Sequence, residues 1–421
     1  MSATPRTRDR SRTHDVVLWG ATGFTGQLVA EYLVQTRTDG DLRLALAGRN
    51  RAKLEALRDR LASIDPGAKS LPIVVADSLD RASLDAMVAD AEVVCTTVGP
   101  YARYGAPLVE ACVEHGTDYC DLTGETTFIR PMIDQHHSTA REQGTRIVCC
   151  CGFDSIPSDL GVLMMQRAMQ DRHGVAATEV KLAVTRTKGG ASGGTIASML
   201  EMMKTLQRDP AARAIVADPY GLNPEGEREG PDGRDRMGAF FDPDLDGWAG
   251  PFVMAAVNTR IVRRSNALQD YAYGHDFRYQ EVVHFPRGLG GVVRAWGLAT
   301  GLIGFLLAMN LPPTRALLSR FFLPSPGEGP DEAEREAGLF EMALFARGPG
   351  TADGPVLHGH VVGHKDPGYG GTAIMLGEAA RCLAVDGPTL ETPGGVLTPA
   401  TAMGDALLSR LRGAGMVFAV D

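Results

Sequence analysis

Three glycines at three-residue intervals follow the first run of residues that favours a β-strand. Gly20, Gly23 and Gly26 belong to the sequence GATGFTG, which ends the strand-like run DVVLW and opens the amphipathic stretch FTGQLVAEYL. A glycine-rich turn between a strand and a helix lets backbone amides and the helix dipole stabilise a pyrophosphate. This context predicts a dinucleotide site, with a plain tight turn as the alternative. The predicted contacts also include the residues between the glycines: Thr22, Phe24 and Thr25.

The second predicted strand ends in Ala47-Gly48-Arg49-Asn50. Enzymes that prefer NAD place an acid near this point, about 20 residues after the glycine loop, to bind the ribose 2′-hydroxyl. Arg49 stands there instead, and its guanidinium can pair with a 2′-phosphate and stack on adenine. The alternative is that Arg49 only ends the strand. We therefore predict that the cofactor is NADPH, bound by Arg49 and the adjacent Asn50.

Further candidate residues end the third and fourth predicted strands, at the carboxyl edge where ligands of parallel sheets bind. Asp77 ends the third strand and is expected beside the adenine, unless it caps the next helix. Gly99 and Pro100 follow the fourth strand and are expected near the nicotinamide half of the cofactor. Tyr101 and Tyr104 come next, as substrate contacts, proton donors or packing residues.

Asp154 follows the sixth predicted strand in the sequence GFDSIPSD, and so belongs to the same edge. Its carboxyl group can contact the nicotinamide ribose or relay a proton, or it can cap the helix that begins near Ser158. Asp121 and Glu125, in DLTGE, fall near this edge as well. The catalytic prediction therefore rests on Tyr101, Tyr104 and Asp154.

Two other groups of residues were weighed for binding chemistry. His358, His360 and His364 alternate along one predicted strand, which gives poor tetrahedral geometry, so no metal site is predicted. The glycine-rich residues 189–195 precede a predicted helix. They form either a loop for a phosphopantetheine phosphate or thioester oxygen, or a simple turn or hinge.

The elements that position these residues divide the chain in two. From residue 15 to about 151, short β-branched runs alternate with amphipathic helices, which predicts a Rossmann-type, doubly wound parallel sheet in an α/β fold. Longer alternating strands after residue 156 predict an inserted α/β substrate domain with a mixed sheet. The expected domains are a disordered basic tail over 1–14, a Rossmann domain over 15–157, a second domain over 158–366, and a helical segment over 367–421 that packs on both.

Residues 295–309 are apolar apart from Thr300. The run is shorter than the roughly 20 residues that a spanning helix needs. We expect a core or pocket-lining helix, with a surface patch that touches lipid as the second interpretation. Peripheral contact with a membrane follows from that second interpretation.

Composition excludes some partners. Of 421 residues, 44% are hydrophobic and 22% charged, and the formal net charge is −9, so we expect no nucleic-acid partner. The seven cysteines contain no C-x-x-C pair, and the chain begins without an apolar leader segment. Both observations favour a reduced, cytoplasmic protein. The oligomeric state stays open, a homodimer included.

Several motifs taken in order carry a resemblance to a known family. After the glycine loop come GRN, VGPYARYG, DLTGE and GFDSIPSD, then KGGASGGTIASML, NTRIVRRSNAL, DPGY, LGE and GVLTPATAMGDALL. Together they cover nearly the whole chain. The chain resembles the saccharopine dehydrogenase-like oxidoreductases and, among these, the mycobacterial trans-acting enoyl reductases.

The resemblance implies a Rossmann domain with an inserted α/β domain, and NADPH as the hydride source. It also implies reduction of a carbon–carbon double bond in a polyketide intermediate of phthiocerol-type lipid synthesis. The partner would be an acyl-carrier-bound intermediate on a polyketide synthase that lacks a working reductase domain.

Three other functions compete with this one. A saccharopine-type or imine-forming dehydrogenase needs clustered cations for its carboxylates, and Arg260, Arg263 and Arg264 are available. A short-chain dehydrogenase/reductase needs Tyr-x-x-x-Lys, and none of the nine tyrosines has lysine four residues later. A non-enzymatic redox sensor or lipid-surface scaffold is the remaining alternative.

Overall fold

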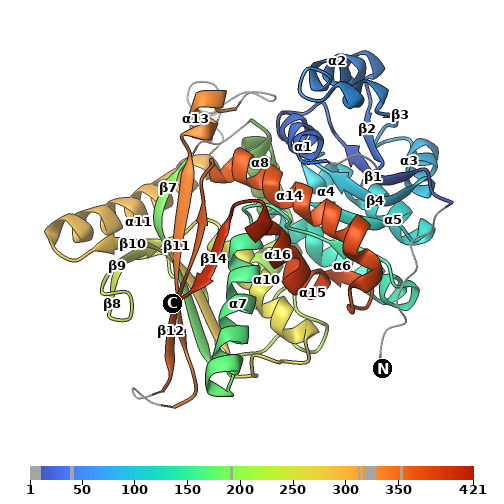
Figure 1. Ribbon diagram of the computed structural model, residues 1–421. Coiled ribbons are helices and arrows are strands. Elements are labelled where there is room, and N and C mark those ends of the chain that lie inside the picture. The colour runs from blue at the N-terminus through green and yellow to red at the C-terminus, as the bar shows by residue number, and fades with distance from the viewer. Residues whose placement is uncertain are drawn as a thin grey trace. The chain divides into compact units, whose positions relative to one another are not determined.

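The computed structural model describes the chain except residues 1–10, 38–41, 190–192, 312, 316–317, 319–328 and 351–353, and of residues 193–197 it describes the backbone alone. Two compact units account for the rest. Unit 1 comprises Met1–Ile156 and Gly368–Ala414, and unit 2 comprises Pro157–Pro367 and Gly415–Asp421. Each unit has its own sheet (Figure 1).

The sheet of unit 1 is parallel throughout. Its strands run in the order β13-β6-β5-β4-β1-β2-β3, which is the doubly wound order with one strand added beside β6. The strands are β1 (His14–Trp19), β2 (Leu44–Gly48), β3 (Ile73–Val75), β4 (Ala91–Thr96), β5 (Asp118–Asp121), β6 (Arg146–Val148) and β13 (Gly395–Leu397). The predicted Rossmann-type sheet is confirmed.

Helices connect these parallel strands. They are α1 (Phe24–Gln35), α2 (Arg51–Leu61), α3 (Arg81–Ala89), α4 (Tyr101–Tyr104), α5 (Ala106–His115), α6 (Thr126–Gln143), α14 (Thr372–Arg381), α15 (Pro399–Ala402) and α16 (Gly404–Gly413). Single turns of 3-10 or π-helix lie at η1 (Pro66–Ser70), η2 (Pro367–Gly371), η3 (Cys382–Asp386) and η4 (Gly387–Thr389).

The central strands of unit 1 are buried on both faces. Every residue of β1 and β4 is buried, as expected for parallel strands covered by helices on each side. The edge strand β3 is only half-buried. Apolar runs without alternation, such as DVVLW, therefore identified the middle of the sheet.

The C-terminal part of unit 1 returns to the same sheet. α14 packs against α1, and the Tyr32 hydroxyl donates to the Glu378 carboxylate at 2.7 Å. β13, in the motif GVLTP, pairs with β6. This strand was not predicted, because three residues carry too little periodicity to distinguish a strand from a loop.

Unit 2 contains a mixed sheet, which confirms the second part of the predicted fold. Its order is β14-β12-β11-β7-β10-β9-β8; β7 and β10 are parallel and the other neighbours antiparallel. The strands are β7 (Glu179–Lys188), β8 (Phe240–Asp242), β9 (Gly247–Pro251), β10 (Arg278–Pro286), β11 (Leu339–Arg347), β12 (Val356–Gly363) and β14 (Val417–Val420).

Its described helices are α7 (Ile156–His173), α8 (Gly193–Arg208), α9 (Pro210–Ala217), α10 (Ala255–Leu268), α11 (Leu289–Asn310) and α13 (Glu332–Glu336). α10 packs on β10 and is buried over most of its length. α11 lies against β9 and β10 (Figure 1).

The expected core or pocket-lining helix at residues 295–309 is not found. The apolar run belongs to α11, and most of that helix is exposed: Leu289 is 83% exposed, Val293 70% and Leu307 62%. Small side chains, Ala295 and Ala299, make the buried face. The prediction was wrong because apolar residues occur on all sides of this helix, a pattern that normally indicates a buried helix. In length and hydropathy α11 also meets the criteria for a membrane-spanning helix, which on their own are weak evidence of one.

The predicted disordered tail ends before residue 14. β1 begins at His14, and the Arg12 side chain donates to the Ala91 carbonyl and, at 2.6 Å, to the His115 carbonyl. The basic composition predicts disorder here, but the Arg12 guanidinium satisfies carbonyl groups at the start of β4 and the end of α5. Residues 1–10 of the predicted tail and residues 190–192 of the glycine-rich loop lie outside the described residues.

Candidate active site

The glycine loop joins β1 to α1 with little room for side chains. Gly20 has a φ of +86°, a region that glycine enters without strain. A Cβ on Gly26 would lie 2.1 Å from the Gly20 carbonyl oxygen, so the first turn of α1 packs directly on the loop. Gly23 is the N-cap of α1 and no side chain caps the helix. The uncapped end of a 12-residue helix is a suitable anion site for a pyrophosphate.

Arg49 lies just beyond β2, next to this loop. The amides of Gly20 and Ala21 both donate to the Ala47 carbonyl, which ties the loop to the end of β2 two residues before Arg49. The Arg49 side chain is exposed. Asn50 is the N-cap of α2 and accepts from the Lys53 amide at 3.0 Å. Arg49 is thus available for a phosphate, while Asn50 has a structural bond of its own.

The ends of β3 and β4 hold the next predicted residues. Asp77 accepts from the Leu79 amide at 2.9 Å, and Asp80 is the residue at the N-cap of α3. Asp77 therefore shapes a turn and does not cap that helix. Gly99 is exposed beyond β4, and the Gly99–Pro100 peptide is cis.

Tyr101 is buried at the start of α4. Its hydroxyl donates to the Thr96 carbonyl at 3.2 Å, and its ring packs on Phe128 at 5.8 Å between centroids. Burial raises the pKa of this hydroxyl well above its usual range. Glu125 accepts from the Tyr101 amide at 3.0 Å and so fixes the turn that carries the ring. Tyr104 is half-buried, with the Arg103 guanidinium 5.1 Å from its ring centroid.

Asp121, at the end of β5, is a fully buried carboxylate. It accepts from the Thr123 amide at 3.0 Å, the Tyr119 hydroxyl at 2.8 Å and the Cys150 amide at 3.0 Å. Burial raises the pKa of Asp121 to about 6, although these hydrogen bonds oppose the change. Asp121 therefore joins β5 to the loop after β6, where Cys150 has a φ of +63°.

Asp154 lies in that loop, beside Asp121. Burial raises the pKa of the Asp154 carboxyl to about 7, and the charge of Asp121 acts in the same direction. Both carboxyl groups also influence the Tyr101 hydroxyl, so the three residues form one cluster at the carboxyl edge of the sheet. Asp154 is the member that retains some exposure. A pKa of about 7 leaves about half of this carboxyl group protonated at neutral pH.

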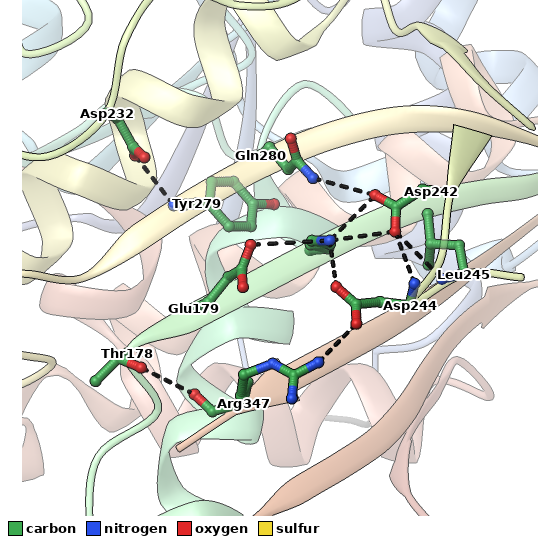
Figure 2. Close-up of polar contacts among 10 residues, drawn as sticks. Thr178, Glu179, Asp232, Asp242, Asp244, Leu245, Tyr279, Gln280 and Arg347 are labelled. Atoms are coloured by element: carbon green, nitrogen blue, oxygen red, sulfur yellow. Dashed lines mark hydrogen bonds and ion pairs between the residues drawn. The ribbon is translucent and has the colours of Figure 1, made fainter. Parts of the chain in front are cut away.

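Unit 2 contains a cavity of about 310 Å³ near the start of β7. It is lined by charged residues from several strands, including Glu179, Lys181 and Asp242. The Lys181 ammonium lies 3.1 Å from Asp242, 3.8 Å from Glu179 and also contacts Asp244, so three carboxylates meet at one nitrogen (Figure 2). These charges satisfy one another. The cluster is therefore a structural network, and Arg236, Arg278 and Tyr279 also line the cavity beside it.

Metal chemistry has no observed basis in the part of the chain that the structure describes. No group of three or more histidine, cysteine or acidic residues there could hold a metal ion. All seven cysteines are buried, and none forms a disulfide bond.

Comparison with known proteins shows the family to which this chain belongs. Residues 16–148 match the saccharopine dehydrogenase NADP-binding domain. A putative trans-acting enoyl reductase of Mycobacterium tuberculosis H37Rv is 46% identical over 99% of this chain and 98% of its own length. The chain belongs to the trans-acting enoyl reductase family. The trans-acting enoyl reductase of Mycobacterium ulcerans is 42% identical over 96% of this chain and 97% of its own length.

A solved structure agrees on the fold of this family member. The saccharopine dehydrogenase (L-Glu forming) of Saccharomyces cerevisiae superposes with a TM-score of 0.51, at 15% identity, over 96% of this chain and 99% of that one. At that identity the likeness concerns the fold alone. The family, the two-sheet fold and an NADP-dependent oxidoreductase, all predicted from the sequence, are confirmed.

The roles of the individual site residues stay predictions. Their positions in the structure can be compared with the positions expected from the sequence. The structure brings together Tyr101 and Asp154, as expected for one sheet edge, and adds Asp121 as their buried neighbour. The Glu125 and Asn50 side chains each accept a hydrogen bond from a backbone amide.

Sequence reasoning missed two residues of unit 1 that border the site. The Tyr369 ring packs edge-on against Phe24 of the glycine loop, with centroids 5.1 Å apart. The Thr372 hydroxyl accepts from the Phe153 amide at 3.0 Å and so supports the loop of Asp154. The available signal was the motif DPGY, which precedes a helix and has a glycine turn typical of a binding loop.

Proposed function

We propose that this protein is an NADPH-dependent trans-acting enoyl reductase that saturates a carbon–carbon double bond in a polyketide or lipid intermediate of phthiocerol-type synthesis. The observation that carries the proposal is the 46% identity to a protein named as such an enzyme, which extends over both units. A shared cofactor domain alone would support only a common cofactor, whereas likeness across the second unit supports a common type of substrate.

The proposed substrate is an acyl chain bound to a carrier protein, delivered by a polyketide synthase that lacks its own enoyl reductase. The cytoplasm is the proposed location of this protein. A trans-acting enzyme must receive its substrate from another protein, so a transient contact with the carrier is part of the proposal.

The residues around the glycine loop fit NADPH. The uncapped N-terminus of α1 suits the pyrophosphate, and the close approach of Gly26 to Gly20 leaves backbone facing the ligand. Exposed Arg49 suits the 2′-phosphate. When bound, NADPH supplies the hydride that the β-carbon of an enoyl thioester receives.

Asp154 is the proposed proton donor to the α-carbon. Its raised pKa of about 7 keeps a large fraction of the carboxyl group protonated at neutral pH, as general acid catalysis requires. Its partial exposure lets water return the proton after each turnover. Tyr101 is less suited because its hydroxyl is committed to the Thr96 carbonyl, and half-buried Tyr104 remains a candidate substrate contact.

The arginines of α10 argue against a dicarboxylate substrate such as saccharopine. Arg260 pairs with Asp235, and Arg263 pairs with Asp232 at 2.8 Å. Arg264 is buried and donates to the Leu222 carbonyl at 2.5 Å. Because these guanidinium groups are already paired inside unit 2, binding a substrate carboxylate would require breaking buried interactions.

Deletion of the gene, followed by mass spectrometry of the lipids, tests this function in the cell. Loss of an enoyl reductase should leave a lipid species two hydrogens short of the wild-type product, restored by the intact gene. An unchanged lipid profile would contradict the proposed function, and altered transcription or localisation with that unchanged profile would favour a non-enzymatic role.

A further inference from the structure

One face of α11 is an exposed apolar stripe. Its large residues follow a spacing of three or four residues, with one gap of seven, along the outer side of the helix, and they are 42–83% exposed. The stripe consists of Leu289, Val293, Trp296, Ile303, Leu307 and, just beyond the helix, Leu311. Soluble surfaces rarely leave so many large apolar side chains in one row, so this face is expected to contact something.

The polar groups expected on the outer side of a surface helix are almost absent from it. Thr300 interrupts the stripe, and its hydroxyl donates to the Trp296 carbonyl at 2.7 Å. Glycines fill other exposed positions, at Gly297, Gly301 and Gly304. Over 22 residues, about 33 Å of helix, the charged side chain is Arg294.

The opposite face holds the helix on unit 2. Gly291, Ala295 and Ala299 are buried, and α11 packs on β9 and β10 through these small residues. Gln207 of α8 donates to the Asn310 carbonyl at 3.1 Å, near the C-terminal end. The helix is therefore fixed along its length, with the apolar stripe turned away from its own sheet.

Charge around the stripe favours an anionic lipid surface. The helix contains no acidic residue, although the whole protein has a net charge of −9. Exposed Arg294 and the uncapped N-terminus after Gly288 are both positive. Arg287 beside them is paired with Asp246 at 2.6 Å. Lipid headgroups attract such isolated basic groups, and tryptophan is favoured at the depth of the membrane interface.

We propose that α11 is a membrane-docking helix that lies flat on an anionic lipid surface. The side chains of the stripe enter the boundary between headgroups and acyl chains, Trp296 lies at that boundary, and Arg294 contacts a lipid phosphate. Because the buried face stays packed on β9 and β10, the helix docks the folded protein and does not cross the bilayer. The proposal does not depend on the reaction assigned to unit 1.

Flotation of the full-length protein with vesicles tests the proposal. Wild-type protein should float with vesicles that contain equal amounts of phosphatidylglycerol and phosphatidylcholine. It should float more weakly with vesicles of phosphatidylcholine alone. The double variant Ile303→Glu, Leu307→Glu should lose about tenfold or more in vesicle affinity. Val356→Glu, which changes a 37% exposed residue at the start of β12, is the matched control and should float as wild type does.

Two further measurements keep the test decisive. Thermal unfolding shows that the double variant is folded, and tryptophan fluorescence quenched by brominated lipid reports whether Trp296 enters the interface. Failure of wild-type protein to float, or equal flotation of the double variant, would overturn the proposal. So would a dimer in sedimentation that dissociates in the double variant, because a second copy would then cover the stripe.

Discussion

Arg49 and Asp154 stand at opposite halves of the expected cofactor and depend on different physical chemistry. In the proposed roles, Arg49 would act through a permanent charge on an exposed side chain. Asp154 would act through a proton that burial retains near neutral pH. The first could be predicted from the sequence because strand order places the residue. The raised pKa of Asp154 could not be predicted, because it depends on burial and on the nearby charge of Asp121.

Replacing Arg49 with alanine should weaken NADPH binding about 10- to 100-fold, since a hydrogen bond between charged groups is worth about 1.5–3 kcal/mol. NADH lacks the 2′-phosphate, so its binding should change little. Dissociation constants from cofactor fluorescence check both values. Lys69→Ala removes another exposed cation of unit 1 and should leave NADPH binding intact. Equal weakening of both cofactors in Arg49→Ala would contradict the assigned role.

Replacing Asp154 with asparagine should lower kcat for enoyl reduction about 10²- to 10⁴-fold, the usual range for a lost general acid. In wild-type protein kcat/KM should fall as pH rises through about 7, because the acid loses its proton there. The variant should lack this decline. Asp80→Asn, at an exposed cap without a side-chain bond, is the control. A variant with wild-type kcat and the same decline would exclude Asp154 as the donor.

The same substitution has an expected effect on stability. The folded pKa of Asp154 is above that of the unfolded chain, so between about pH 4 and 7 the folded state holds a proton that the unfolded state releases. Stability from this group is present at low pH and is lost as pH rises. Asp154→Asn should therefore be more stable than wild type at pH 8, by thermal unfolding, whereas a purely structural carboxylate would predict the reverse.

At the scale of elements, the glycine loop and α1 form a single packed unit. Gly26→Ala should weaken NADPH binding tenfold or more and lower the free energy of unfolding by about 1–3 kcal/mol, because its Cβ would overlap the Gly20 carbonyl. Gly413→Ala, at a helical position with open space, should be neutral or slightly stabilising. Titration calorimetry and chemical unfolding measure both. A Gly26→Ala protein that binds NADPH normally would show that this contact is dispensable.

β7 offers a matched pair of ion pairs. Lys181→Met should lower the free energy of unfolding by about 3–5 kcal/mol, since it leaves buried Asp242 without its cation, while Asp244 keeps its pair with Arg347. Arg186→Met, also on β7, breaks an exposed pair with Glu341 of β11 and should cost less than about 1 kcal/mol. Urea unfolding compares the two. Similar losses for both variants would mean that burial of the Lys181 network contributes little.

Elements also show where the sequence was informative. Buried parallel strands such as β1 and β4 have long apolar runs, and the glycine loop has a fixed place after the first strand, so both were predictable. β13 was too short to show a period. α11 was predicted as core because its apolar residues surround it, and only the structure shows that one face has no covering. The paired state of Arg263 was likewise invisible, since Asp232 is distant in sequence.

At the scale of the whole molecule, likeness to known enoyl reductases extends from the cofactor unit through the mixed-sheet unit. A parallel sheet that binds NADP is common to many reactions, so its presence cannot select a substrate. The second unit buries the arginines of α10 in internal pairs and exposes the apolar stripe of α11. These features support the proposed lipid-linked substrate over an amino-acid substrate.

The most direct test mixes the purified protein with NADPH and an α,β-unsaturated acyl thioester, ideally one attached to an acyl carrier protein. The account predicts that NADPH is consumed in step with a product two mass units heavier than the thioester, and that saccharopine with NADP gives no reaction. Saccharopine oxidation, with no NADPH consumed for any unsaturated thioester, would contradict it.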